Sequence, residues 1–518
     1  MSITSFWFLV LILTGTIVYY IIPKKLQWME LLLLSLVFYY FAASPRTIVY
    51  LATFTAVAYF STLLMQKYRS RNRDSKVPFR LVIVSVVFII LIWFAVKGRE
   101  LWEPIADGVI SRISPEYAER LDGMQITAAL GMGYFTLQIL GYIIDCYWEN
   151  IEPQRNPLKL FLFLVYFPQL TTGPISRYGK LTALFEQHKF NYDRICMGAQ
   201  RILWGFMKKI VIAERVGTIV SGILANPADY HGFYSWIAVL IYPIQMYADF
   251  SGCMDIVLGV SELFGITLAE NFNNPFFART SQEFWQRWHI TLGTWAKDYV
   301  LYPLLKSAPM VRFGKSARKK FGKTKGGFLQ NCVGMFCLWM VMGIWHGGYK
   351  YIVGVSLWYW IILMLGNLTS PFFAKMTEKL GMKVESFSWH LFQSMRTYVI
   401  YAIGATFFMH GIKGGLELLR DCIRVFLFSK NANPWIFFDG SIWGLGVKYY
   451  DIIIIMIGAV CLLLVGILRE RYGYARIWMQ QQTFVFRWFI WLSLFAFILI
   501  FGQYGPGYSA AEFIYQGF

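Results

Sequence analysis

Long apolar stretches recur along the 518-residue chain, and they constrain its fold more than any other feature. A helix needs about 20 mainly apolar residues to cross a bilayer. Stretches of about this length occur at residues 5–22, 28–43, 46–65, 80–97, 124–144, 199–224, 233–264, 328–346, 350–368, 395–412, 450–468 and 487–503. Shorter apolar pieces near 157–172 and 290–305 are typical of re-entrant or interfacial helices. The sequence therefore predicts an all-α polytopic membrane protein with about 11–13 transmembrane helices.

The composition agrees with a membrane protein rather than a soluble one. Only 15% of the residues are charged and 57% are hydrophobic, whereas soluble domains carry about 25% charged residues. The net charge of +19 is explained by loops that hold the cytoplasmic side of the membrane. Nucleic acid is not expected as a partner, because no basic patch alternates with stacking aromatic residues.

The positions of the basic loops predict the orientation of the chain. Basic residues gather at Lys24 and Lys25 and in segments 67–76, 148–159, 306–325 and 469–487. If these segments face the cytoplasm, both termini lie outside a plasma or inner membrane. The first span lacks a basic start and a small-residue cleavage site, so we expect it to be retained. No long linker divides the chain, so residues 1–518 are expected to form one membrane domain.

Neither the cysteines nor the histidines form a metal-binding pattern. The seven cysteines contain no Cys-x-x-Cys pair, and the six histidines contain no His-x-x-x-His pair. We therefore expect no metal site and no tightly bound cofactor.

Residues 270–305 interleave aromatic and charged side chains more densely than the rest of the chain. One interpretation is an interfacial helix with an aromatic belt. The other is a functional segment that includes Arg287, Trp288, His289 and Lys297. The pattern alone leaves both open.

His346 lies within the apolar run "MVMGIWHGGYKYIV" (340–353). A helix from Phe328 to this residue rises about 27 Å, deep into a membrane. Ionisable residues at such depth are costly and usually functional. The alternative is a buried histidine that bonds a neighbouring hydroxyl or carbonyl. Gly343, Gly347 and Gly348 allow another backbone or a ligand to approach the imidazole closely.

Five segments occur in a family-like order: "YFPQLTTGPISRY" (166–178), "GFMKKIVIAERV" (205–216), "YADFSGCMDIVLGVSELFGITLAENFNNPFFA" (247–278), "EFWQRWHITLGTWAKDYVLYPLL" (283–305) and "GIWHGG" (343–348). With these segments the chain resembles the membrane-bound O-acyltransferase family. The nearest resemblance is to its alginate O-acetyltransferase branch, which is related to the teichoic acid D-alanyl transferases. The resemblance implies a fold with a central tunnel and a catalytic core at about residues 125–370.

The resemblance also implies roles for individual residues. His346 matches the catalytic base, and His289 matches the second histidine of the family, nearer the cytoplasmic mouth. Asn273, Arg287, Trp288 and Lys297 are candidates for contacts with the acyl donor. The C-terminal "YSAAEFIYQGF" (508–518) resembles a family motif whose tyrosine relays the acyl group, which would be Tyr515. Gly517 stands where the family often has an aromatic residue, and an amphipathic outer-face tail (504–518) is the alternative.

The function implied is transfer of an acyl group from a cytoplasmic thioester, with acetyl-CoA as the expected donor, to a cell-surface or exported polysaccharide. An imidazole suits the removal of a hydroxyl proton, because its ordinary pKa of about 6.5 lies near working pH. The expected partners are the donor, the polysaccharide acceptor, membrane lipid and an extracytoplasmic acyltransferase with an SGNH-hydrolase fold. The alternatives are D-alanyl transfer from a carrier protein and a non-catalytic transporter or export scaffold.

Several other polar residues have plainer interpretations. Arg177, Lys208 and Lys209 are expected to be cytoplasmic anchors. Asp255 either lines the tunnel or is paired inside the bundle. Asn271 and Asn273 are expected to satisfy the broken backbone more than to bind the donor.

Overall fold

A computed structural model describes residues 1–113, 127–427 and 440–505, and in these ranges the chain is helical. The described part contains one isolated antiparallel bridge, between Phe272 and Trp288. Helices are the expected outcome for apolar spans, because lipid offers no hydrogen bonds and a helix satisfies its own backbone.

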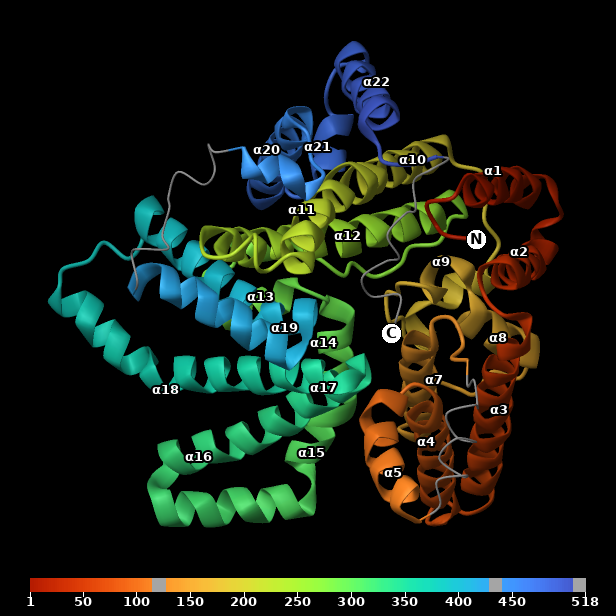
Figure 1. Ribbon diagram of the computed structural model, residues 1–518. Helices are drawn as coiled ribbons and strands as arrows, with labels where there is room; N and C mark the ends of the chain where they lie inside the picture. The colour runs from red at the N-terminus through yellow and green to blue at the C-terminus, as the bar shows by residue number, and fades with distance from the viewer. Residues whose placement is uncertain (114–126, 428–439, 506–518) are drawn as a thin grey trace.

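Figure 1 shows the order of the helices. The first half contains α1 (Phe6–Ile21), α2 (Gln27–Ala42), α3 (Ile48–Arg71), α4 (Val77–Val96), α5 (Arg99–Ile113), α7 (Met132–Tyr147), α8 (Pro157–Val165), α9 (Phe167–Leu170), α10 (Tyr192–Phe206), α11 (Glu214–Ala225) and α12 (Phe233–Leu263). The second half contains α13 (Ser281–Arg287), α14 (Ile290–Ala296), α15 (Tyr302–Lys306), α16 (Ala308–His346), α17 (Gly348–Tyr351), α18 (Trp358–Lys379), α19 (Phe387–Leu427), α20 (Tyr449–Tyr472), α21 (Ala475–Gln480) and α22 (Phe484–Phe501). Three π-helical segments interrupt them: η5 (Met207–Ala213), η7 (Lys297–Leu301) and η8 (Ile352–Leu357). Short 3-10 turns are η1 (Lys24–Leu26), η2 (Pro45–Thr47), η3 (Tyr178–Lys180), η4 (Thr182–Phe185), η6 (Pro275–Phe277) and η11 (Ser441–Leu445).

In the described ranges, eight helical stretches are long and apolar enough to cross a membrane. They are Pro45–Arg71, Val77–Val96, Phe233–Leu263, Ala308–His346, Gly348–Lys379, Phe387–Val425, Tyr449–Tyr472 and Phe484–Phe501. The spans expected at 5–22, 28–43 and 124–144 correspond to the shorter helices α1, α2 and α7, which have 16 residues each. The chain is therefore an all-α, multi-pass membrane protein, with several helices shorter than a full bilayer crossing.

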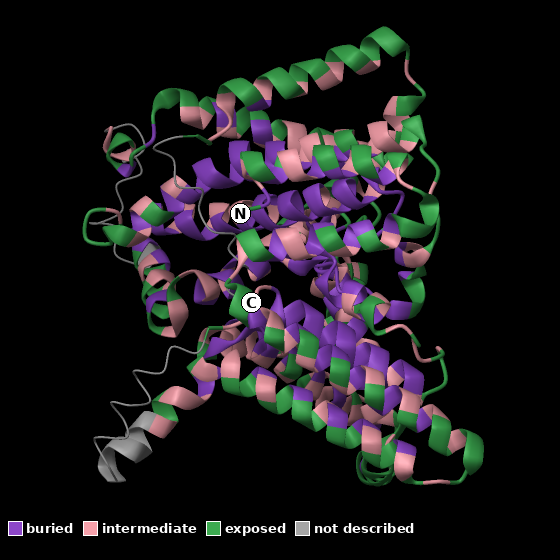
Figure 2. Cartoon of the chain, turned by 90° about the vertical axis from the view of Figure 1, so that its right-hand side faces the viewer, coloured by how far each residue is buried: buried purple, intermediate pink, exposed green. Residues whose placement is uncertain are grey.

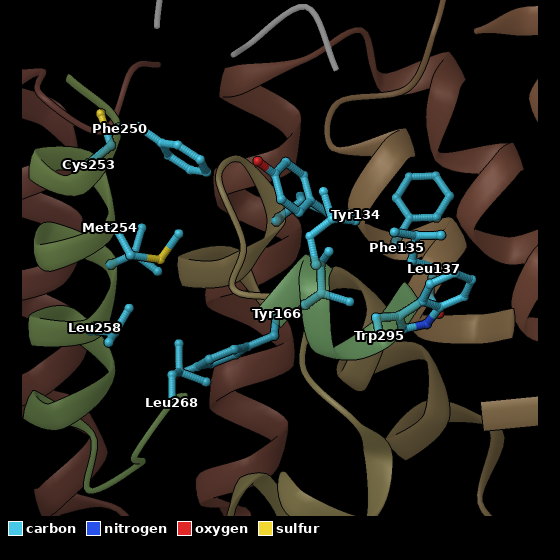
Figure 3. Packing of buried hydrophobic residues seen from close by; sticks show 14 of the residues in the cluster. Tyr134, Phe135, Leu137, Tyr166, Phe250, Cys253, Met254, Leu258, Leu268 and Trp295 are labelled. Carbon is cyan, nitrogen blue, oxygen red and sulfur yellow. The ribbon is translucent and has the colours of Figure 1, made fainter. Parts of the chain in front are cut away.

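The main core cluster includes residues of α7, of α12 and of the α8–α9 junction. Almost every residue of α7 is buried, which explains why the sequence of this helix is mainly apolar on all sides. Figure 3 shows Phe250 and Met254 of α12 across from Tyr134 and Tyr166. Figure 2 shows buried residues concentrated in the central helices and exposed ones on the outermost helices. Exposed apolar side chains on peripheral helices such as α4 and α22 face the surroundings, as expected for contact with lipid.

The basic segment 306–325, expected as a loop, is helical. Most of it forms the first arm of α16, which begins at Ala308 and turns back on itself at Gly322, where φ is 82°. Figure 1 shows the two arms side by side. Gln330 of the second arm donates to the carbonyl of Met310 and accepts from Arg318, so the arms are tied together. The expectation was wrong because a run of lysine and arginine forms a good helix once a glycine supplies the turn.

Lys208 and Lys209, expected as cytoplasmic anchors, are buried in ion pairs. Lys208 contacts Asp255 at 2.6 Å, and Lys209 contacts Asp249 at 2.6 Å and Glu214 at 2.8 Å. Their neighbour Arg201 on α10 contacts Asp255, Glu262 and Glu270. We call these eight residues the ion-pair network: Arg201, Lys208, Lys209, Glu214, Asp249, Asp255, Glu262 and Glu270. The expectation failed because most of the acidic partners lie about 40 to 70 residues away in the chain, on α12 and in the segment after it. Glu214, at the start of α11, is the one partner close in sequence.

Candidate active site

His346 is the last residue of α16 and is buried, with 8% of its surface exposed. The helix ends there because Gly347 adopts a φ of 81°, a conformation that glycine tolerates. One turn earlier, Gly343 lies so close to η8 that an added Cβ would stand 2.0 Å from Ser356 Oγ. That hydroxyl donates to the Trp339 carbonyl of α16 at 2.7 Å. Close helix packing therefore holds the end of α16 in place.

His289 lies in the short connection between α13 and α14. Its backbone is left-handed, with φ of 47° and ψ of 51°. This geometry is uncommon for a residue with a side chain and often accompanies functional positions. The bridge between Phe272 and Trp288 and the bond from the Ile290 amide to the Asn271 carbonyl hold the connection.

Asn271 orients the His289 imidazole. The Asn271 Oδ1 atom accepts from the Thr291 backbone amide at 3.0 Å and from the Thr291 hydroxyl at 2.8 Å. A backbone amide only donates, so the atom beside it is the amide oxygen of Asn271. His289 Nδ1 lies 3.2 Å from the same oxygen and must carry a proton to bond it. In the neutral ring, Nε2 is then the nitrogen with the free lone pair.

The two histidines lie on the same cavity, and their ring centroids are 6.5 Å apart. The cavity has a volume of about 230 Å³. His289 Nε2 is buried and has no hydrogen-bond partner among the residues that the structure describes. Trp345 packs against both rings, and Tyr351 stacks on His346 with centroids 5.5 Å apart. The geometry provides two imidazoles around a small, largely apolar space.

The structure brings together some of the predicted site residues and separates others. Trp288 and Lys297 line the cavity with the two histidines. Arg287 instead pairs with Glu283 and with Glu470 of α20. Asn273 pairs its backbone amide with the Arg287 carbonyl and is not among the lining residues. Tyr515 lies outside the described residues.

The structure adds residues to the cavity that sequence reasoning did not single out. Trp285 and Trp339 lie with centroids 5.0 Å apart, and neither indole N–H has a partner in the described ranges. The other additions are Gln282, Gln286, Leu292, Gly293, Asn331, Met335, Leu338, Met342, Tyr351, Val355, Leu363, Met364, Asn367, Tyr401 and Phe408. Trp285 lies within the aromatic segment 270–305, which was the signal that could have found it. The cavity residues of α18 and α19 carried no signal, because apolar residues recur throughout those spans.

No cluster of three or more histidine, cysteine, aspartate or glutamate side chains in the described ranges could hold a metal ion. The polar groups of the cavity include its two imidazoles and the indole N–H groups of Trp285 and Trp339, which have no partner among the described residues. An imidazole with a free lone pair can accept a proton from a hydroxyl group. Indole N–H groups can hold a carbonyl or a developing oxyanion in a site that excludes water.

The motifs around this cavity belong to a known family. A sequence model of the membrane-bound O-acyltransferase family matches residues 35–410, which include both histidines. A probable alginate O-acetylase of Pseudomonas syringae pv. tomato is 24% identical over 75% of this chain and 68% of its own length. A teichoic acid D-alanyltransferase of Bacillus subtilis is 30% identical over 48% of this chain and 60% of its own length.

A peptidoglycan O-acetyltransferase of Helicobacter pylori is 30% identical over 36% of this chain and 41% of its own length. The chain thus spans less than two thirds of the Bacillus and Helicobacter relatives that it matches. The family match, by contrast, covers most of the chain and agrees with the helical, multi-pass fold. The chain belongs to the membrane-bound O-acyltransferase family, and it is an O-acyltransferase of the membrane.

Proposed function

We propose that this protein moves an acetyl group from acetyl-CoA across the membrane for O-acetylation of a cell-surface or exported polysaccharide. The observation that carries the proposal is the placement of His289 and His346 on one cavity, with their ring centroids 6.5 Å apart. The printed functions of the relatives support O-acylation of a surface polymer. The small cavity favours a short acyl group.

In the proposed step, His346 acts as the general base. It takes the proton of an acceptor hydroxyl as the oxygen attacks the thioester carbonyl. The new C–O bond forms, the C–S bond breaks, and the proton passes to the leaving thiolate. His289, with its free Nε2 lone pair, accepts a hydrogen bond from an N–H or O–H group of the substrate and orients it.

The donor is proposed to enter from the cytoplasm. Lys297, Gln282 and Gln286 are among the residues that line the cavity, and these polar groups suit the polar end of a thioester donor. The basic first arm of α16 follows α15 directly and would attract phosphates. With the basic segments on the cytoplasmic side, both chain termini are proposed to lie outside. An extracytoplasmic acyltransferase with an SGNH-hydrolase fold is proposed to complete transfer to the polymer.

Tyr515 is proposed to receive the acyl group before it reaches the polymer. The support is the C-terminal resemblance alone. The relay requires acylation of the tyrosine hydroxyl, which increases the mass of the C-terminal peptide by that of the acyl group.

The testing experiment uses purified protein, isotope-labelled acetyl-CoA and mass spectrometry of the peptide that contains Tyr515. Label on Tyr515 in the wild type, absent in His346→Ala, supports donor, base and relay together. Turnover of the donor without label on Tyr515 removes the relay only. If His346→Ala consumes the donor as fast as the wild type, His346 is not the base.

The Bacillus relative favours one second candidate, D-alanyl transfer from a carrier protein. Offering D-alanyl-loaded carrier protein in the same assay separates the two. Faster consumption of that donor than of acetyl-CoA would replace the acetyl proposal and leave the acyltransferase mechanism in place.

A further inference from the structure

A second, larger cavity lies away from the two histidines, between α20 and α22. Its volume is about 420 Å³, within the range of roughly 300–1,000 Å³ that ligand sites occupy. Apolar residues of the two helices, such as Leu464 and Phe497, form its walls, and α21 closes one end. The α22 helix contacts α10 and η5, and Gln503 after it donates to the Ile210 carbonyl of η5. Most of the surface of α20 and α22 is not covered by other helices, so the groove between them can be reached by lipid.

The groove becomes basic at the end where α20 stops and α22 begins. Residues 469–487 include four arginines and one glutamate. The glutamate, Glu470, is already bonded by Arg287 and Asn274. Arg476 is also satisfied, because it contacts both carboxylate oxygens of Glu262. The carboxylates near this end are therefore occupied by other cations.

Two arginines of segment 469–487 line the groove, Arg469 and Arg476, and of these two Arg469 lacks a carboxylate partner among the described residues. It donates to the Phe272 carbonyl at 3.0 Å and lies over the Tyr474 ring at 4.8 Å, but it forms no ion pair with any described residue. A guanidinium has five N–H donors, so most of its donors remain for a ligand. Arg469 lines both the apolar groove and a small polar cavity beside it, of about 50 Å³. The charge of the groove's polar end therefore fits an anion.

The wall of α22 adds a neutral donor. Trp491 lines the groove, and its buried indole N–H has no hydrogen-bond partner among the described residues. An indole N–H inside an apolar groove is costly unless a ligand oxygen reaches it. Phospholipids supply such oxygens as esters, between an anionic phosphate and apolar chains.

We propose that this groove binds one anionic phospholipid, with its phosphate at Arg469, an ester oxygen near Trp491 and an acyl chain between α20 and α22. Basic pockets between transmembrane helices on the cytoplasmic side are a recurrent form of lipid recognition. The site lies apart from the two-histidine cavity, so the proposal is independent of the acyl-transfer mechanism.

Native mass spectrometry of the full-length protein tests the site, with phosphatidylglycerol and phosphatidylcholine offered at equal amounts. The wild type is expected to retain one phosphatidylglycerol and little phosphatidylcholine. Arg469→Gln is expected to lower phosphatidylglycerol occupancy about fivefold, the loss expected for one basic contact near a membrane surface. Arg312→Gln, an exposed arginine on the first arm of α16, is the matched control and should change nothing.

A second variant guards against misfolding of Arg469→Gln. Ser493→Trp fills the groove from α22 and keeps Arg469, so it should also lower phosphatidylglycerol binding. The proposal is overturned if the wild type retains neither lipid or both equally. It is also overturned if Arg312→Gln reduces binding as much as Arg469→Gln, or if Arg469→Gln and Ser493→Trp both bind like the wild type.

Discussion

Two buried polar regions of this protein differ in how completely their groups are paired. In the ion-pair network, the cations are Arg201 of α10 and Lys208 and Lys209 of η5. Each of them contacts at least one carboxylate of α12. In the two-histidine cavity, His289 Nε2 and the indole N–H groups of Trp285 and Trp339 have no partner among the described residues. Paired charges hold helices in register, whereas unpaired donors and acceptors beside a cavity remain available to a substrate.

This difference matters because both regions look costly in a membrane. Removing one partner of a buried ion pair strongly destabilises the folded protein, because the other charge is left buried and unpaired. Removing a cavity group that has no protein partner leaves no such buried charge. Substitutions in the network should therefore affect folding, and substitutions of the cavity's reactive groups should affect activity. The following predictions test that separation, from the largest expected effect to the smallest.

Replacing His346 by alanine should reduce acyl transfer by about 10²–10⁴-fold, the usual contribution of a general base. The thermal stability of the purified protein should change less than the activity, because His346 borders a cavity rather than filling the densest part of the core. The rate of labelled acetyl-CoA consumption measures the effect. His231→Ala, an exposed histidine whose ring contacts the Ala228 carbonyl, serves as the control. Equal loss in both variants would remove the special role of His346.

Replacing Asp255 by leucine should destabilise the fold by about 3–5 kcal/mol, because Lys208 loses its carboxylate inside the bundle. Unfolding of the purified protein by a denaturing detergent measures the effect. The double variant Lys208→Met with Asp255→Leu should recover part of the loss, since Arg201 keeps Glu262 and Glu270. A double variant less stable than Asp255→Leu alone would show that the network does not act through charge compensation.

Replacing Gly343 by alanine should cost about 1–3 kcal/mol, the usual penalty for overpacking. The added Cβ would stand 2.0 Å from Ser356 Oγ, and thermal melting measures the loss. Adding Ser356→Ala should relieve part of it. Gly327→Ala, where a Cβ meets nothing within 4 Å, should not destabilise the protein. The same melting temperature for Gly343→Ala and Gly327→Ala would contradict the tight packing at the end of α16.

Replacing Asn271 by leucine should lower activity about fivefold to tenfold, because one hydrogen bond of about 1 kcal/mol no longer sets the His289 tautomer. Asn271→Asp keeps the acceptor oxygen and should retain more activity. Nitrogen NMR of labelled histidine, assigned with His289→Gln, should show the proton on Nδ1 in the wild type and a changed pattern in Asn271→Leu. A leucine variant with the wild-type nitrogen spectrum would mean that Asn271 does not orient the ring.

Much of the fold follows from the sequence because membrane spans are a local signal. Apolar length predicted the helices α3, α4, α12, α20 and α22 closely, since each must satisfy its own backbone. The weaker expectations concerned polar segments. The basic run at 306–325 became a helical arm because a single glycine supplied the turn, a choice that charge counting does not capture.

Only part of the candidate site could be predicted from the sequence. His289 and His346 carried motif resemblance, and the structure places both on one cavity. Arg287 resembled a donor contact in sequence, but it binds Glu470, a residue 183 positions away. Tertiary contacts at that separation decide whether an arginine is free or paired.

The sequence by itself determined the class of the protein, because hydropathy, charge and motif order are properties of the chain alone. Only the tertiary structure decided which polar residues hold the fold and which face a cavity. The physical reason is that the free energy of a buried charge depends on its partners. Lys208 is neutralised by Asp255, and Asn271 orients the His289 ring. Arg469 forms no ion pair with a carboxylate among the described residues. In the sequence, all three are simply polar residues within or beside apolar helices.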